Sequence, residues 1–412
     1  MSMLIKNIKG IVQVEEQLRE KVCGADMSSL KTLDDGWLLV ENGLISGFGP
    51  MECLPQGDFE EEIDATGRFL FPSFCDCHTH LVYAGSREQE FIDKVNGLSY
   101  QEIAKRGGGI LNSMELLAKT SEEELFEQTM QRALEIISKG TGAVEIKSGY
   151  GPDLESELKM LRVAKRIGRE TPLEVKSTFL GAHAVPKSYA GNKEEYVNDL
   201  INTYIPVIAT EDLADYIDVF CEDGFFSVED ADRILNAGMK YGLRAKVHAN
   251  QLSFSGGVAI GVKYGAISVD HLESSDIEEF EMLKNSETMP VVLPGASFFL
   301  NMHYAPAKKM IEYGLPLALA SNYNPGSCPS GDLKFMMSLA SIHMKLNTQQ
   351  VINAATLNGA YAMGLSHSHG SIAKGKVANL FLTKEIPSLD YIPYSFNTQI
   401  IDTIILKGKI TT

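Results

Sequence analysis

The feature that most constrains the fold of this 412-residue chain is a repeated alternation of short apolar segments with longer amphipathic ones. The short segments predict buried strands, and helical periodicity separates most of them. The predicted strands are Phe69–Cys75, Ala143–Lys147, Glu174–Leu180, Tyr216–Cys221, Arg244–Val247, Ala266–Val269, Pro290–Leu293 and Pro316–Ala320. The clearest predicted helices are Glu122–Ser138, Leu154–Arg169, Val228–Tyr241 and Asp276–Asn285. This α/β pattern is typical of a (β/α)8 TIM-like barrel, although a doubly wound sheet shows the same alternation.

Reactive side chains follow nearly every predicted strand, and their placement favours the barrel. In a closed barrel the carboxyl ends of all strands converge on one mouth, whereas an open sheet would spread them along an edge. Five of these side chains are histidines. A single histidine at a strand end is more often a core or loop residue whose hydrogen bonds are satisfied, but five together are hard to explain by structure alone. The residues are His78, His80, Lys147, Tyr150, His183, Glu222, His248, Asp270, His271 and Asn322.

The two ends of the chain differ from its middle. Residues 4–65 read as short strands joined by turns, and the tail repeats that style from Lys374 to Ile410. We therefore predict a small β-sandwich domain built from residues 1–66 and 366–412, which flanks a catalytic barrel formed by residues 67–365.

His78-Thr79-His80 closes the first predicted barrel strand. Residues i and i+2 of a strand point to the same face, so both imidazoles can reach one metal ion. Neutral imidazole is a common ligand of zinc and iron. The chain holds a second pair, His367-Ser368-His369, in a turn-like stretch before Gly370, which we interpret as structural.

The amino-acid composition limits the classes of molecule that this protein is expected to bind. A net charge of −17 disfavours nucleic acid and anionic membranes, but allows a small anionic substrate that needs only a local arginine. No apolar run approaches the roughly 18–20 residues of a transmembrane helix, and the first residues lack a signal-peptide core. The six cysteines are sparse and irregular, so we expect a reduced, cytoplasmic setting.

Several segments carry a family resemblance. They are Asp76–Val82, Gly85–Arg87 with Glu90-Phe91, Gly107–Ile110, Glu145–Gly151, Thr178–His183, Asp270–Glu273, Leu293–Gly295 and Asn324–Gly326. With histidines after strands one, five and six, the chain resembles the amidohydrolase superfamily. More narrowly, it is similar to the imidazolonepropionase family.

The resemblance implies hydrolysis of 4-imidazolone-5-propanoate to N-formimidoyl-L-glutamate, in histidine degradation, with one zinc or iron ion. It implies that the metal ligands are His78, His80, His248 and the residue at position 322. It also implies a substrate pocket and a homodimer. The implied pocket residues are Arg87, Tyr150, His183, Gln251, Asn324, Gly326 and Ser327.

The chemistry of the residues supports these roles. His271 beside Asp270 is suited to carry a proton from water to the departing nitrogen, and His183 could help to polarise the ring carbonyl. Arg87 can hold a propanoate carboxylate with two hydrogen bonds. The fourth predicted strand offers no lysine to bridge two metals, so one ion is expected. Glu222 is either a carboxylate behind a ligand histidine or a surface carboxylate.

Two departures from the family pattern leave alternatives open. Asn322 stands where the family usually has Asp, and an amide brings neither charge nor a proton acceptor of carboxylate strength. The sequence His248-Ala249-Asn250-Gln251 also lacks a nearby carboxylate. The alternatives are therefore a catalytically impaired protein that binds the ligand, or a related cyclic amidohydrolase with another substrate.

Overall fold

Eight parallel strands form a closed barrel in the computed structural model, which describes residues 2–98 and 108–411. They pair in the order of the chain, from β6 to β13. Backbone hydrogen bonds from Asn322 to His78 and from His80 to Tyr323, both 3.0 Å, close the ring between the last strand and the first. The strands are β6 (Phe74–Thr79), β7 (Thr141–Lys147), β8 (Glu174–Ala182), β9 (Tyr216–Cys221), β10 (Arg244–Ala249), β11 (Ser268–His271), β12 (Met289–Val292) and β13 (Ala318–Leu319).

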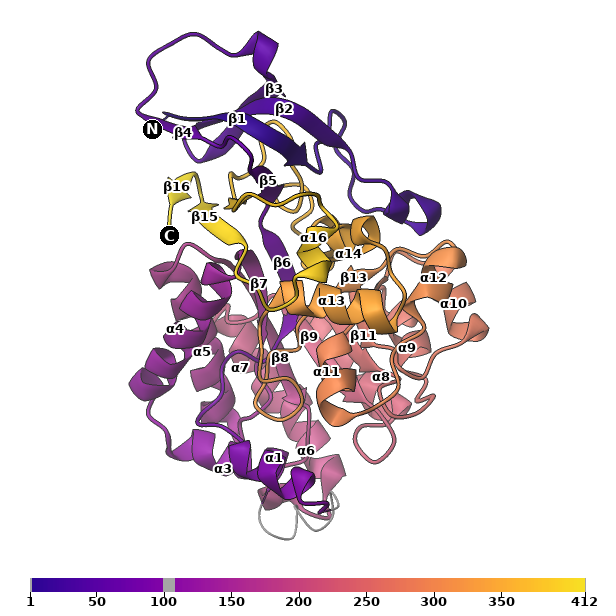
Figure 1. Cartoon of the computed structure of the whole chain (residues 1–412). Coiled ribbons are helices and arrows are strands. Elements are labelled where there is room, and N and C mark those ends of the chain that lie inside the picture. The colour runs from indigo at the N-terminus through magenta and orange to yellow at the C-terminus, as the bar shows by residue number, and fades with distance from the viewer. Residues whose placement is uncertain (1, 99–107, 412) are drawn as a thin grey trace.

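Helices surround the barrel (Figure 1). They are α1 (Glu88–Val95), α3 (Ile110–Lys119), α4 (Glu122–Ser138), α5 (Leu154–Glu170), α6 (Lys193–Asp199), α7 (Ile205–Thr210), α8 (Val228–Lys240), α9 (Gly257–Lys263), α10 (Ile277–Lys284), α11 (Pro294–Leu300), α12 (Ala307–Glu312), α13 (Leu333–His343), α14 (Thr348–Ala355), α15 (Leu357–Tyr361) and α16 (Tyr391–Tyr394). Capping residues fix where several helices begin. Ser121 caps α4, and Ser227 with Asp230 forms a capping box at the start of α8.

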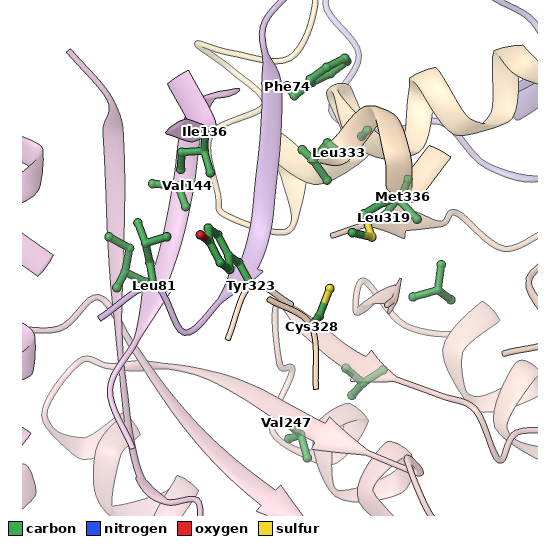
Figure 2. Packing of buried hydrophobic residues seen from close by; sticks show 14 of the residues in the cluster. Phe74, Leu81, Ile136, Val144, Val247, Leu319, Tyr323, Cys328, Leu333 and Met336 are labelled. Atoms are coloured by element: carbon green, nitrogen blue, oxygen red, sulfur yellow. The ribbon is translucent and has the colours of Figure 1, made fainter. Parts of the chain in front are cut away.

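The strands alternate apolar residues that face the helices with polar residues that face the barrel interior. Ile217 and Val219 of β9 join the main apolar core, while Asp218 between them is buried among other polar groups. Because successive side chains point to opposite faces of a strand, this alternation is a direct consequence of the pleat. Figure 2 shows the helix-facing side, where Ile136 of α4 lies against Val144 of β7.

Both ends of the chain contribute to a second, mixed sheet, as predicted. Its strands pair in the order β16-β15-β14-β5-β1-β2-β3, and β4 adds to β1. They enclose a separate apolar core. The expected sandwich is joined into one hydrogen-bonded sheet because β1 pairs with β4 along its first half and β5 near its end. The strands are β1 (Ser2–Val12), β2 (Thr32–Glu41), β3 (Leu44–Pro50), β4 (Glu61–Asp64), β5 (Phe69–Pro72), β14 (Leu380–Thr383), β15 (Ile401–Leu406) and β16 (Lys409–Ile410).

The first predicted barrel strand is in fact two strands. Phe69–Pro72 is β5 of the small sheet and pairs with β14, whereas β6 starts at Phe74 and pairs with β7. Ser73 marks the change, since its N–H donates to Asn379 while the N–H of Phe74 donates to Gly140. Hydrophobicity could not show the break, because both strands are fully buried. The domain boundaries after residues 66 and 365 stay predictions.

Candidate active site

Three histidines from three strands meet at the carboxyl end of the barrel. A ring nitrogen from each of His78, His248 and His271 lies within 4.8 Å of the other two. All three side chains are buried. Burial holds the pKa of His78 well below the usual imidazole value and lowers that of His248 to about 4. Both rings are therefore neutral near pH 7, which is the form that binds metals.

His80 completes a cluster that fits one metal ion. Its Nε2 atom lies 3.4 Å from Nε2 of His248. Two ligands of one tetrahedral zinc, each about 2.0–2.1 Å from it, are roughly 3.3–3.4 Å apart, so this spacing suits a shared ion. Burial also lowers the pKa of His80, so this ring offers a lone pair rather than a proton.

Carboxylates behind two of the rings fix which nitrogen is free. Nδ1 of His78 donates to Asp270 at 2.6 Å, and Nδ1 of His248 donates to Asp218 at 3.0 Å. The Nε2 atom of each ring is then unprotonated, and that of His78 has no hydrogen-bond partner among the described residues. A carboxylate behind a ligand histidine is the usual arrangement in metal sites.

Asn322 also offers an unused acceptor. Its Nδ2 donates to Ser327 at 3.3 Å, while its buried Oδ1 has no partner in the part of the chain that the structure describes. Its φ of 57° is left-handed, a conformation that asparagine and aspartate tolerate better than most residues. His271 also has a positive φ, of 91°, so the backbone turns sharply at two site residues.

A layer of fully buried charges lies beneath the histidines. Lys147 donates to Glu145 at 2.7 Å and to Asp218 at 2.8 Å, and lies 3.6 Å from Asp270. Lys246 donates to the other oxygen of Glu145 at 2.6 Å. Burial would lower the pKa of Lys147, but the three surrounding carboxylates raise it. The layer thus balances most of its charge internally, as buried ions must.

A cavity of about 510 Å³ opens above the histidines. It contains every substrate-pocket residue expected from the sequence, together with His80, His248, His271 and Asn322. Glu90 and Lys94 of α1 and Ile110 of α3 form part of its wall, so the cavity lies at the end of the barrel opposite the small sheet (Figure 1). Phe220, Phe225, Leu300 and Met302 add apolar surface.

Arg87 is held in this cavity by neighbours. Its Nε donates to Ser113 of α3 at 2.8 Å, and its side chain is only 12% exposed. A Cβ atom at position 326 would lie 2.2 Å from Nη1, so glycine there leaves room for the guanidinium. Asn324 shapes the same loop, because its Oδ1 accepts from the N–H groups of Gly326 and Ser327, both at 2.8 Å.

Comparison with known proteins assigns the family. The model of the amidohydrolase family matches residues 69–411. The imidazolonepropionase of Christiangramia forsetii is 53% identical over 410 residues, covering 100% of both chains. That of Flavobacterium johnsoniae is 53% identical over 407 residues, covering 99% of both. The chain belongs to the amidohydrolase family, among the imidazolonepropionases.

A solved structure supports the fold alone. A variant of the atrazine chlorohydrolase of Arthrobacter aurescens, complexed with zinc and atraton, superposes with a TM-score of 0.71 at 14% sequence identity. The match covers 99% of this chain and 94% of the other. None of the described helices is both long enough and apolar enough to cross a membrane.

Two of the expected contacts are wrong. Asp270 does not lie against His271, because it points beneath the site and accepts from His78; the carboxylate nearest to His271 is Glu273, with Nδ1 and Oε1 3.4 Å apart. Among the described residues, Glu222 accepts from Leu252 and Ser253 rather than from a histidine. Gly107, in one of the family-like segments, lies outside the described residues.

Sequence reasoning also missed Asp218, Glu145 and Lys246. A signal was present, because each is a charged residue that stands between two apolar residues of a buried strand. Such a charge must find a partner inside the protein. Which partner it finds depends on the neighbouring strand, so residue type alone could not assign Asp218 to His248.

Proposed function

We propose that this chain hydrolyses 4-imidazolone-5-propanoate to N-formimidoyl-L-glutamate, in histidine degradation, with one divalent metal ion. The observation that carries the proposal is the cluster of neutral His78, His80 and His248, of which His80 and His248 line a cavity that also holds Arg87. Membership of the imidazolonepropionases supports the substrate.

The residues fit the metal. His78, His80 and His248 would bind it, with the free Oδ1 of Asn322 as the fourth ligand. Zinc and iron both suit three imidazoles and an oxygen. When bound, such an ion supplies Lewis-acid polarisation of the ring carbonyl and makes water nucleophilic near neutral pH.

Arg87 and His183 orient the substrate. With Nε engaged by Ser113, Arg87 directs its remaining N–H groups at the propanoate carboxylate. We expected His183 to polarise the ring carbonyl of the substrate, but its hydrogen bonding suits another role. Its Nδ1 donates to the carbonyl of Gly149 at 3.2 Å, so the neutral ring presents an accepting Nε2. We assign that atom to a ring N–H of the substrate, while Tyr150 and Gln251 line the walls.

His271 carries the proton. Glu273 accepts from its Nδ1 and stabilises the imidazolium that forms when the ring takes the proton of the attacking water. The same proton then goes to the departing ring nitrogen as the carbon–nitrogen bond breaks. The carbonyl carbon keeps the oxygen of the water, and the product gains a second carboxylate.

Asn322 favours one second candidate, an impaired protein that binds the ligand without turnover. Metal analysis and an absorbance assay of imidazolonepropanoate loss separate the two. Metal together with turnover supports the enzyme. Metal and ligand binding without turnover supports the impaired protein. Turnover of another cyclic amide alone would identify a related amidohydrolase.

The proposal also covers the cellular compartment and the oligomeric state of the protein. We infer a cytoplasmic enzyme, because histidine degradation supplies its substrate and its cysteines are free thiols. We also infer a homodimer, from family resemblance, which sedimentation of the purified protein would test.

A further inference from the structure

We infer that Lys147 is a positioning residue that organises the metal site without touching the metal or the substrate. This inference rests on the metal site of the proposed function. Lys147 is the one ammonium group among the described residues that reaches both carboxylates behind the ligand histidines, at 2.8 Å from Asp218 and 3.6 Å from Asp270.

The geometry makes Lys147 the common support of two ligands. Oδ2 of Asp218 accepts from both Lys147 and Nδ1 of His248. Oδ2 of Asp270, which accepts from His78, faces the same ammonium group. One cation thus holds in place the two acceptors that fix the ring orientation and tautomer of His78 and His248.

Electrostatics explains why a cation is needed there. Glu145, Asp218 and Asp270 are 0–1% exposed, and their mutual repulsion is not screened by water. Without Lys147, Asp218 and Asp270 would move apart or turn away from the imidazoles. Each ring could then rotate or protonate at the wrong nitrogen, and ligands that lose such support typically lose 10–100-fold in metal affinity.

Lys246 provides a matched control. It is also fully buried, and it donates to the same Glu145, but no ion pair joins it to Asp218 or Asp270 in the described part of the chain. Lys147→Met and Lys246→Met therefore remove the same charge at the same depth. Only the first removes the contact to the carboxylates behind the ligand histidines, since Lys246 donates instead to Glu145 and to the backbone carbonyls of Cys77 and Ala362.

The experiment measures Zn²⁺ affinity of metal-free protein by competition with a chromophoric chelator. Histidine tautomers are read by ¹⁵N NMR in the same samples. We expect Lys147→Met to weaken Zn²⁺ binding on the order of 10–100-fold, and to abolish the single Nδ1–H tautomer of His78 and His248. Lys246→Met should weaken it less than about 3-fold. Wild-type affinity in Lys147→Met, or equal loss in both variants, would overturn the inference.

Two further variants keep the result decisive. If Lys147→Met does not fold, Lys147→Met/Asp270→Asn keeps the net charge of the layer and is compared with Asp270→Asn alone. The double variant should bind Zn²⁺ about 10-fold more weakly; equal affinity contradicts a role for Lys147. His78→Ala/His80→Ala tests the metal site itself. If it retains Zn²⁺, the proposed function fails, whereas its loss beside normal binding by Lys147→Met rejects only the role of Lys147.

Discussion

The guanidinium of Arg87 lies so close to Gly326 that a Cβ atom at position 326 would be 2.2 Å from Nη1. Arg87 precedes α1, and Gly326 belongs to the loop after β13, so two distant segments of the chain meet at this contact. The loop places Gly326 through Asn324, whose Oδ1 accepts from its N–H. The direction of the arginine therefore depends on a residue without a side chain.

Gly326→Ala should displace Arg87 and weaken binding of the propanoate. We expect KM to rise on the order of 10–100-fold with a smaller change in kcat, because the reacting groups stay in place. Gly57→Ala is the matched control, since a Cβ there meets only Phe59, at 3.6 Å. Unchanged steady-state kinetics in Gly326→Ala would place the carboxylate elsewhere.

Arg87→Met removes the charge and keeps most of the side-chain bulk. A charge-assisted contact in a partly closed pocket contributes about 2–4 kcal/mol. We expect kcat/KM to fall roughly 30- to 1000-fold. If kcat/KM equals that of the wild type, Arg87 does not contact the substrate.

His78→Ala/His80→Ala should abolish metal binding, because it removes two of three imidazole ligands. Elemental analysis of purified protein measures this directly, and the wild type should hold one ion per chain. His367→Ala serves as control, since that side chain is exposed and belongs to the other His-x-His pair. Two ions per wild-type chain, or an ion retained in the double variant, contradicts the assignment.

Many strand and helix positions were readable from the sequence because they had a local signal, whereas the break at Ser73 had none. The segment Tyr216–Cys221 was predicted at its observed bounds, and so was Glu122–Ser138. The convergence of the strand-end histidines followed from barrel topology, since parallel strands bring their carboxyl ends together. The comparisons confirm the family and the fold that these residues indicated.

The hydrogen-bond partners of the buried carboxylates could not be predicted from the sequence. Asp270 was assigned to His271, its neighbour in sequence, but the two side chains diverge because the backbone turns at His271, whose φ is 91°. Asp270 instead meets His78, which is distant in sequence but bonds to it across the barrel interior. Such pairings depend on strand register and side-chain reach, and no local pattern encodes either.

His369, in the second His-x-His pair, should make the free energy of unfolding depend on pH. Burial lowers the pKa of His369 to about 4, and its Nδ1 bonds with Ser368. The imidazole of His369 has a pKa of about 6.5 in the unfolded chain and about 4 in the folded chain. The unfolded chain therefore binds a proton first, and the folded state loses stability as the pH falls through that range. From pH 7 to 5 we expect the loss to reach about 2 kcal/mol. Urea unfolding of metal-free wild type and His369→Gln should show a smaller loss in the variant; equal losses would contradict the assignment.

Asn322→Asp tests the fourth ligand position. An anionic oxygen binds a divalent ion more strongly than an amide oxygen, so metal affinity should rise. The left-handed backbone at position 322 accommodates aspartate as well as asparagine, so folding should not change. If the carboxylate also accepts the proton of water, turnover should rise roughly 10²–10⁴-fold.

His271 separates the two ways in which Asn322→Asp could act. If His271 beside Glu273 already carries the proton, Asn322→Asp improves metal retention but barely changes kcat at saturating metal, and His271→Ala removes activity in both backgrounds. If aspartate becomes the base, Asn322→Asp keeps part of its gain when His271 is replaced. The free Oδ1 of Asn322 predicts a gain in metal affinity in either case. If neither metal content nor rate increases, position 322 is not a ligand, and His271, whose ring nitrogen already lies within 4.8 Å of those of His78 and His248, becomes the candidate for that place.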